Sequence, residues 1–185
     1  FMFNYLGREL SRAQRLRTPV SILVLDLDRF KDINDTYGHH VGDRALREVA
    51  RVLREATRPY DLCVRYAGDE FIVVLADCGT DDAEAKRIEL QQAVDELVFE
   101  VERGERARLS VSIGAAVFPQ DGETYEALLA TADGRMYRDK KARKRSGPAR
   151  PASAAVAAAR EAAHVDEAQA APAHDRVRPF VARVG

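Results

Sequence analysis

The stretch LCVRYAGDEFIVVL at residues 62–75 decides the fold, because it predicts a tight β-hairpin. Its two halves, 62–66 and 71–75, are short runs that favour β-branched, aromatic and other apolar residues, as strands do. The four residues between them, Ala67–Glu70, contain a glycine and are few enough for a hairpin turn. Strands joined by such a turn run antiparallel, so the sheet cannot be wholly parallel.

Upstream of the hairpin, we expect one more buried strand and two helices. Residues 20–25 form a short apolar run rich in β-branched residues, which is typical of a buried strand, and the run stops at Asp26. Apolar residues recur at helical spacing over 2–15 and over about 41–56, which predicts two amphipathic helices. The segment between the strand and the second helix is expected to be a turn region that ends at residues 37–39.

Downstream of the hairpin, helix and strand signals continue to alternate. Residues 81–82 provide an aspartate cap for a long helix that is expected to extend to about Val101. Residues 109–117 alternate as a strand, and a last helix begins at Thr124 and ends in the basic cluster 140–145. These elements predict an α/β fold of the α+β kind, with a mixed or antiparallel sheet flanked by helices.

The composition changes after residue 145. Alanine dominates residues 146–185 and prolines punctuate them; the segment offers few large apolar side chains for a core, so we expect a disordered tail. The predicted domains are therefore 1–145 and the tail 146–185. Since the chain begins inside the first predicted helix, it is expected to be a fragment whose amino-terminal edge is truncated.

The composition as a whole excludes some classes of partner. Hydrophobic residues make up 46% and charged residues 32%, as in ordinary globular proteins. A formal net charge of −1 gives no general attraction to nucleic acid, so no nucleic-acid partner is expected. Cys63 and Cys78 lack the spacing of metal ligands, and no apolar run approaches the roughly 18 residues of a membrane helix. These features favour a cytoplasmic location.

The chemistry is expected where acidic residues meet at one end of the sheet. Asp26 ends a strand that otherwise looks buried, and Asp69 and Glu70 lie in the hairpin turn. A buried carboxylate is costly unless it is paired, protonated or bound to a cation. Carboxylate oxygens suit Mg²⁺, which usually works beside substrate phosphates. The alternative is that each acid only caps a turn or meets a surface lysine, and spacing alone leaves both interpretations open.

The turn sequence also resembles a known signature. Residues 66–71, YAGDEF, resemble the Gly-Gly-Asp/Glu-Glu-Phe motif of the GGDEF family, the diguanylate cyclases. The agreement extends over about residues 1–145. Five further stretches follow in the family order: LDLDRFK at 25–31, INDTYGH at 33–39, GD at 42–43, SIG at 112–114, and AD with MY at 132–137.

This resemblance implies a fold and an activity. The family fold is a nucleotidyl-cyclase or polymerase-palm-like domain, with a five-stranded central sheet flanked by helices. Its members condense two GTP molecules into cyclic di-GMP, a bacterial second messenger, and release two pyrophosphates. Each domain holds one GTP, so the resemblance implies a catalytic homodimer. It also implies that a sensory or membrane-spanning segment precedes the domain in the complete protein.

The family roles can be carried over residue by residue. The resemblance implies that Asp26, the backbone carbonyl of Leu27, Asp69 and Glu70 bind Mg²⁺, with Mn²⁺ as an alternative ion. Asp69 and Glu70 are also the expected catalytic residues.

The expected substrate contacts lie on three segments. Asn34 and Asp43 would bind the guanine edge, because an amide and a carboxylate match its donors and acceptor. The turn at residues 29–31, which comprises Arg29, Phe30 and Lys31, would bind the β- and γ-phosphates. Lys140 falls at the triphosphate-binding lysine of the family, and Lys144 falls where an arginine is frequent. The expected substrate-binding set is completed by His39, Ala67 and Gly68.

Two further positions bear on regulation and on activity. Arg58 and Asp61 match the Arg-x-x-Asp site through which many members are inhibited by cyclic di-GMP; the alternative is a surface ion pair. Ala67 stands where the family usually has glycine, and residues 143–145 replace its Gly-Arg-Asn ending. We expect an active diguanylate cyclase. The alternative is a weak or inactive module that binds GTP or cyclic di-GMP as a sensor, and the intact acids disfavour a purely structural dimerisation domain.

Overall fold

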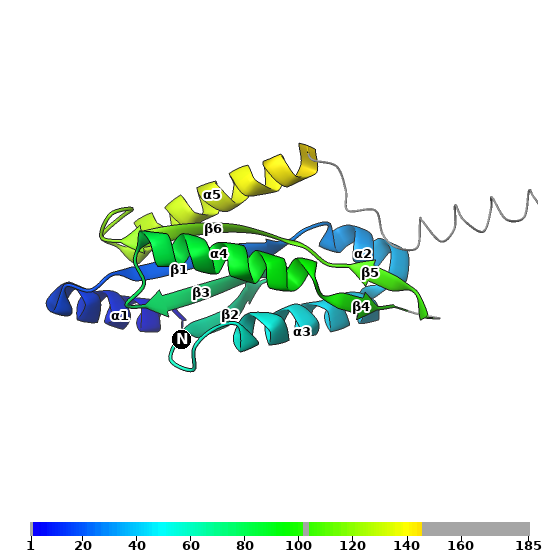
Figure 1. Ribbon diagram of the computed structural model, residues 1–185, viewed down its shortest axis with the longest axis horizontal. Coiled ribbons are helices and arrows are strands. Elements are labelled where there is room, and N and C mark those ends of the chain that lie inside the picture. The colour runs from blue at the N-terminus through cyan, green and yellow to red at the C-terminus, as the bar shows by residue number, and fades with distance from the viewer. Residues whose placement is uncertain (1, 102–103, 146–185) are drawn as a thin grey trace, which may run out of the picture.

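The computed structural model describes residues 2–101 and 104–145, and the predicted tail at 146–185 lies outside these residues. The main sheet has four antiparallel strands in the order β2-β3-β1-β6, and β4 and β5 form a separate two-stranded sheet (Figure 1). The strands are β1 (Val20–Leu27), β2 (Leu62–Ala67), β3 (Glu70–Ala76), β4 (Val98–Glu100), β5 (Arg106–Arg108) and β6 (Val111–Phe118). The helices are α1 (Met2–Leu16), α2 (Phe30–Tyr37), α3 (His39–Glu55), α4 (Thr80–Asp95) and α5 (Tyr125–Arg145).

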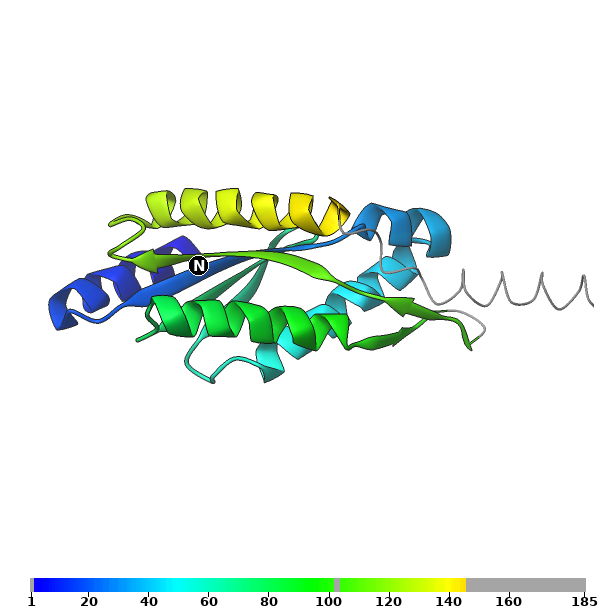
Figure 2. The ribbon, with the colours of Figure 1, turned by 45° about the horizontal axis from the view of Figure 1, so that its top comes forward.

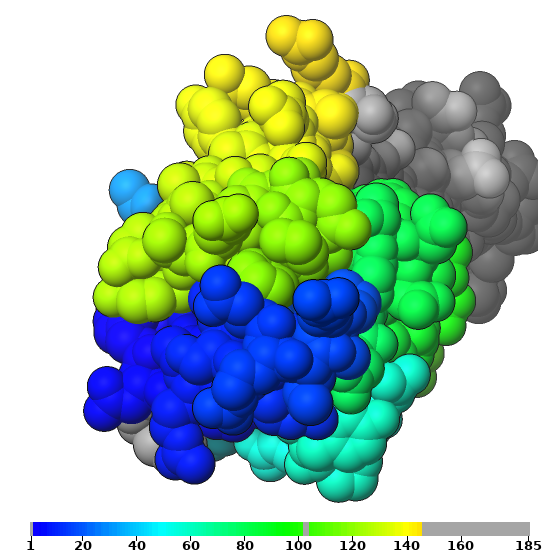
Figure 3. All heavy atoms as spheres, turned by 90° about the vertical axis from the view of Figure 1, so that its left-hand side faces the viewer, coloured from blue at the N-terminus to red at the C-terminus, as the bar shows by residue number. Residues whose placement is uncertain are grey.

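Helices cover both faces of this sheet. Side chains of β1 alternate between two cores, since Ile22 and Val24 pack with α1 and α5, whereas Leu23 and Leu25 pack with α3 and α4. Figure 2 shows α5 above the sheet and α3 and α4 below it. In the end-on view of Figure 3, α1 in blue lies directly against the yellow-green start of α5. The expected α+β architecture is confirmed.

Three expectations about the elements are corrected. The main sheet has four strands within the described residues rather than five, because β4 turns back to pair with β5 beside Gly104, which has a φ of 76°. The expected turn region after β1 contains the short helix α2, which Gly38 separates from α3 with a φ of 84°. The helix α4 ends at Asp95 rather than near Val101, since the next residues alternate as a strand that buries Phe99.

The predicted hairpin is confirmed. β2 and β3 pair in antiparallel register from Leu62 opposite Val74 to Arg65 opposite Phe71, with an irregularity before Ala67. Gly68 takes the left-handed conformation at the turn, with a φ of 50°, which glycine adopts at little cost.

The outer edge of β6 is closed by side chains. An edge strand presents unpaired backbone groups, which invite pairing with other chains unless they are covered. Four side chains from α4, α5 and the loop between β6 and α5 satisfy these groups, and we call them the β6 edge network. Its contacts are Gln91 Nε2 to the Val111 carbonyl at 3.2 Å, the Ile113 amide to Asp139 at 3.0 Å, Arg135 to the Ala115 carbonyl at 2.7 Å, and the Val117 amide to Asp121 at 2.9 Å.

A glycine on β6 lets α5 lie very close to the sheet. A Cβ atom at Gly114 would fall 2.0 Å from the carbonyl oxygen of Ala132 and 2.2 Å from the amide nitrogen of Met136. These are backbone atoms, which cannot move aside cheaply. The close approach brings the carboxyl-terminal half of α5, including Lys140, to the end of β1.

None of the helices in the described part of the chain combines the length and the apolar character that a bilayer-spanning helix needs.

Candidate functional site

The structure brings the three predicted acids together at the end of β1, and we call this set, Asp26, Asp69 and Glu70, the acidic corner. Asp26 stands directly opposite Glu70 on β3, and the Leu27 amide donates a hydrogen bond of 3.2 Å to the carbonyl of Asp69. Only 8% of Asp26 is exposed, although its side chain is a carboxyl group. The central strand and the hairpin turn therefore converge as the sequence indicated.

The turn tolerates the alanine that replaces the family's glycine. Among the described residues, the non-glycine residues with a positive φ are Arg17, Arg29 and Asp77. Ala67 is not one of them, so its backbone conformation is ordinary. The left-handed position is Gly68, whose carbonyl accepts a hydrogen bond of 2.7 Å from Arg65 Nε. Conformational freedom is therefore not required at position 67.

Negative charge exceeds positive charge in the acidic corner. Burial raises the pKa of Glu70, and the charges of Asp26, Asp69 and Asp133 raise it further, whereas Lys140 opposes the shift. Lys140 Nζ donates a hydrogen bond of 2.5 Å to Asp26 Oδ1. One lysine thus faces several carboxylates, and a cation bound here would relieve their repulsion.

The donor set of the acidic corner fits a hard divalent cation. Carboxylate and carbonyl oxygens are the ligands that Mg²⁺ prefers. The side chain of Asp26 accepts its hydrogen bond from Lys140 through Oδ1. Its other oxygen, Oδ2, is therefore available to a ligand. As they stand, no three histidine, cysteine or acidic residues in the described ranges are grouped as a preformed metal site. The residues fit the ion by their chemistry and charge and not by a preformed geometry, and Lys140 contacts Asp26, the first of the predicted ligands.

Asp28, two residues further on, differs from Asp26 because both of its carboxylate oxygens are occupied. Ser112 donates a hydrogen bond of 2.6 Å to Oδ1, and Ser110 donates one of 3.1 Å to Oδ2. Arg143 Nε lies 3.4 Å from Oδ2, and the same guanidinium contacts both oxygens of Asp95 at 2.8 and 2.9 Å. Asp28 therefore anchors the end of β1 to α4 and α5. This network was not predicted from the sequence, in which the two serines on one face of the predicted strand were the available signal.

Asn34 has an unsatisfied acceptor. Its side-chain oxygen is buried without a hydrogen-bond partner, and it lies so close to α3 that a Cβ atom on Gly42 would fall 1.9 Å away. A buried acceptor without a donor is costly, so a ligand that donates a hydrogen bond would be favoured here. The neighbouring Asp43 lines an open hollow of about 350 Å³ between α3 and β2, whose apolar lining includes Leu46 and Phe71. This arrangement suits the predicted contact with a purine base.

The remaining predicted substrate residues lie on α2, α3 and α5 or next to them. Arg29 immediately precedes α2 with a φ of 57°, its side chain contacts Asp32 at 2.7 Å, and Phe30 and Lys31 are the first residues of the helix. The first amides of a helix lack intrahelical acceptors and can bind anions. Lys144 near the end of α5 and His39 at the start of α3 are both exposed.

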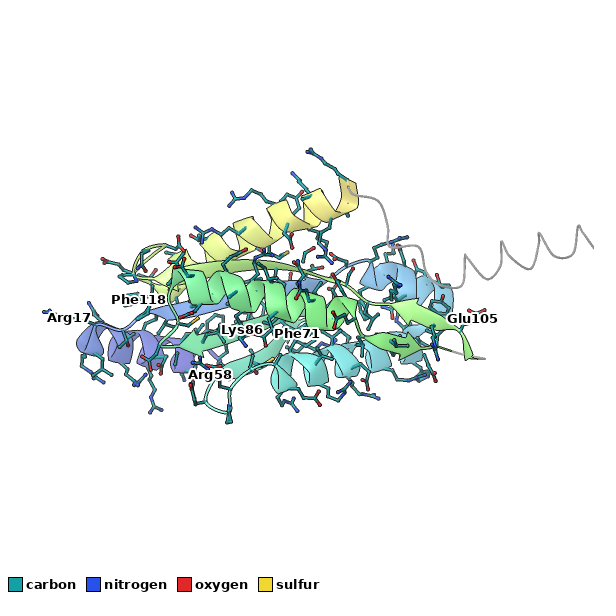
Figure 4. The ribbon with its side chains drawn as sticks, viewed as in Figure 1. Arg17, Arg58, Phe71, Lys86, Glu105 and Phe118 are labelled. Atoms are coloured by element: carbon teal, nitrogen blue, oxygen red, sulfur yellow. The ribbon has the colours of Figure 1, made fainter. Side chains whose placement is uncertain are left out.

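Arg58 and Asp61 lie at the opposite end of β2 from the signature turn. Asp61 accepts hydrogen bonds from the amides of Arg58 at 3.0 Å and of Ala76 at 3.4 Å, which fixes the loop between α3 and β2. The exposed guanidinium of Arg58 lies 5.8 Å from the centre of the Tyr60 ring. Figure 4 shows Arg58 on this loop, apart from Phe71 at the start of β3. The pair therefore forms a separate surface feature.

Comparison with known proteins places the chain in a family. The family described as "Diguanylate cyclase, GGDEF domain" matches residues 1–146. Diguanylate cyclase DosC of Escherichia coli is 38% identical over 137 residues, which are 74% of this chain and 30% of DosC. Response regulator PleD of Caulobacter vibrioides is 39% identical over 141 residues, which are 76% of this chain and 31% of PleD. The chain thus spans about 30% of the length of these relatives.

Solved structures agree with this assignment. The crystal structure of the GGDEF domain of YfiN from Pseudomonas aeruginosa superimposes with a TM-score of 0.73 at 35% identity, covering 76% of this chain and 88% of that one. The GGDEF domain of DgcB from Caulobacter crescentus, solved in complex with c-di-GMP, gives a TM-score of 0.68 at 28% identity, covering 78% and 82%. The chain belongs to the diguanylate cyclase GGDEF-domain family.

Proposed function

We propose that this domain is a diguanylate cyclase, which condenses two GTP molecules into cyclic di-GMP and releases two pyrophosphates. The observation that carries the proposal is the acidic corner: Asp26 at the end of the central strand lies opposite Glu70 at the hairpin, and Lys140 contacts Asp26. The charges of Asp26 and Asp69 both act on Glu70. The similarity to named diguanylate cyclases and to a c-di-GMP-bound structure supports it.

The reaction consists of two equivalent steps. The 3′-hydroxyl oxygen of one GTP attacks the α-phosphorus of the other, the bond to the β-phosphate oxygen breaks, and pyrophosphate leaves. The reciprocal attack then closes the ring. Mg²⁺ held by Asp26, the Leu27 carbonyl, Asp69 and Glu70 would polarise the α-phosphate and ease deprotonation of the hydroxyl. Glu70, which stands opposite Asp26 at the start of β3, is the carboxylate that we assign to orient the hydroxyl and receive its proton.

The nucleotide is held by three groups of residues. Asn34 and Asp43 bind the guanine edge, and the unpartnered Asn34 oxygen accepts from a base donor. The amides of residues 29–31, with Lys140 and Lys144, bind the phosphates. Since one domain holds one GTP, two copies must face each other, and catalysis requires a homodimer. In the complete protein, an upstream sensory segment would control this encounter.

Product formation is the direct test. Purified protein is incubated with GTP and MgCl₂, and cyclic di-GMP and pyrophosphate are quantified by chromatography. We expect both products in a one-to-two ratio, with an initial rate per protein that rises with protein concentration. Chelation of the metal should stop the reaction. The matched control is Asp77→Asn, which removes an exposed acid at the far end of β3.

GTP binding without product would favour a second candidate function. The reason to consider it is Ala67, which replaces the glycine that is usual in the family. The domain would then be a sensor that binds GTP or cyclic di-GMP. Calorimetry with GTP and with cyclic di-GMP distinguishes the two ligands, and absence of binding to either would contradict both candidates.

We further propose that cyclic di-GMP inhibits the enzyme at Arg58 and Asp61. The guanidinium is exposed, and the loop that carries it is fixed by the two hydrogen bonds of Asp61. Arginine binds phosphates and the guanine edge with paired hydrogen bonds. Added product should inhibit the unchanged enzyme and leave Arg58→Ala active; equal inhibition of both proteins would exclude this site.

A further inference from the structure

The two carboxylates on either side of Leu27 are each neutralised by a cation from α5. Lys140 contacts Asp26 at 2.5 Å, and Arg143 contacts Asp28 at 3.4 Å. Residues three apart on a helix lie on the same face, so one face of α5 supplies both cations. The two ion pairs differ, however, in how firmly the cation is held.

Arg143 is a fixed counter-ion. It contacts both oxygens of Asp95 as well as Asp28, and Asp28 is held by two serine hydroxyls. Each partner of this pair is thus also held by other groups, Arg143 by Asp95 and Asp28 by the serines.

Lys140 is a replaceable counter-ion. Its one hydrogen-bond partner among the described residues is Asp26, and its flexible stem ends in a compact charge that can change partner by rotation. The side chain of Asp26 is 12% exposed and that of Lys140 is 25% exposed, so the pair is only partly screened by solvent. A cation that takes Asp26 as a ligand must displace the ammonium group, because two positive charges so close together repel each other.

We propose that Lys140 is the resident counter-ion of Asp26 in the metal-free domain, and that it leaves Asp26 for the nucleotide triphosphate when a divalent cation binds. The cation and the nucleotide therefore bind cooperatively. Without nucleotide, Lys140 competes with the cation; with nucleotide, the triphosphate accepts the displaced lysine. The nucleotide half of this inference rests on the proposed function, whereas the competition between Lys140 and the cation does not.

The test measures binding of Mn²⁺ in the absence of nucleotide, by the electron paramagnetic resonance signal of the free ion. In Lys140→Met the ammonium group is removed, so we expect Mn²⁺ to bind about tenfold more tightly than to the unchanged domain. Lys141→Met is the matched control, since it removes the same charge from the next residue, whose ammonium lies over the Tyr137 ring at 4.4 Å. Equal or weaker binding by Lys140→Met, or an equal gain in Lys141→Met, would overturn the proposal.

A second titration measures the cooperativity. A GTP analogue with a methylene bridge between the α- and β-phosphates is added at saturation, and Mn²⁺ affinity is measured again after a protein-free titration has been used to subtract the Mn²⁺ that the analogue binds by itself. The analogue should increase Mn²⁺ affinity more in the unchanged domain than in Lys140→Met, where the competition is already absent. An equal increase in both would contradict the transfer of Lys140 to the triphosphate.

The two proposals can fail separately. A domain that shows the Mn²⁺ competition but makes no product contradicts the cyclase assignment alone. A domain that makes cyclic di-GMP while Lys140→Met binds Mn²⁺ no better contradicts the role of Lys140 alone. Circular dichroism confirms folding, and Lys140→Gln, which keeps much of the side-chain length, replaces the methionine variant if that variant unfolds.

Discussion

The β6 edge network and the acidic corner both contain charged groups at a margin of the same sheet, but they are paired to different degrees. In the network, Asp121 accepts hydrogen bonds of 2.7 Å to each oxygen from Arg135 and another of 2.9 Å from the Val117 amide. In the acidic corner, Lys140 contacts one oxygen of Asp26, while burial and then the charges of Asp26, Asp69 and Asp133 raise the pKa of Glu70. Satisfied polar groups stabilise the fold, whereas an excess of one charge prepares a site for a ligand.

The largest expected effect is in the acidic corner. Asp69→Asn removes a proposed metal ligand, so the rate of cyclic di-GMP formation should fall at least about a thousandfold. The free energy of unfolding without metal should not decrease, because a repelling charge is lost. Product assays and urea denaturation measure the two quantities. If Asp69→Asn kept its activity, or lost activity only because it unfolded, the acidic corner would not differ from the β6 edge network in having a role in catalysis and not in stability.

The next effect concerns the unsatisfied oxygen of Asn34. Gly42→Ala places a methyl group where Asn34 Oδ1 lies 1.9 Å away, so the amide must move. We expect the KM for GTP to rise about tenfold, because roughly one hydrogen bond to the base is lost. The change in kcat should be smaller. Gly7→Ala on α1 is the control, since its Cβ atom would meet nothing within 4 Å. An unchanged KM would show that Asn34 does not bind the base.

A smaller effect, on stability and not on catalysis, is expected in the β6 edge network. Asp121→Asn should lower the free energy of unfolding at neutral pH by about 1 kcal/mol, since it weakens a charge-assisted pair. The hydrogen bonds from Arg135 lower the pKa of Asp121, so the folded state binds this proton less readily than the unfolded chain. Its stabilisation is present above the ordinary aspartate pKa and is lost as the pH falls through the lowered value.

Denaturation of both proteins across the acid range measures this effect. The difference between the unchanged domain and Asp121→Asn should shrink as the medium becomes more acidic. The rate of cyclic di-GMP formation per folded molecule should be the same in both. A difference that grew on acidification would contradict the assignment of the shift to the Arg135 pair.

The smallest effect is expected at the signature turn. Ala67 has an ordinary backbone conformation, so restoring glycine relieves at most a contact between its methyl group and the nucleotide. We expect Ala67→Gly to change the KM for GTP by no more than about threefold, less than the worth of one hydrogen bond. Steady-state kinetics measure this. A gain of a hundredfold would mean that the methyl group blocks the site.

Local patterns were sufficient to predict the four strands of the main sheet and the hairpin, because a buried run and a glycine-containing turn specify them within a few residues. They did not predict β4 or β5. The convergence of Asp26 and Glu70 also required β1 to pair with β3, which the hairpin alone does not determine. Helix α2 could not be predicted in this way, since it is short and buries only Ile33. The shorter α4 also depended on a tertiary contact, the burial of Phe99.

The pairing of side chains within the site required the structure. Lys140 and Asp26 are 114 positions apart, and their contact depends on the close packing of α5 against Gly114. The same packing brings Arg143 to Asp95. Neither spacing nor residue type indicates which lysine on α5 meets which carboxylate, so the contact of Lys140 with Asp26 was not predicted.

The position of β1 has a consequence for how the domain opens. This strand is hydrogen-bonded to β3 on one side and to β6 on the other, with helices over both faces. Its amides should exchange with solvent only when the whole domain unfolds, whereas those of the loop at Arg58 should exchange through local fluctuations. The carboxylate at the end of β1 is thus fixed to the slowest-opening part of the molecule, and peripheral loops can diverge in sequence without loosening it.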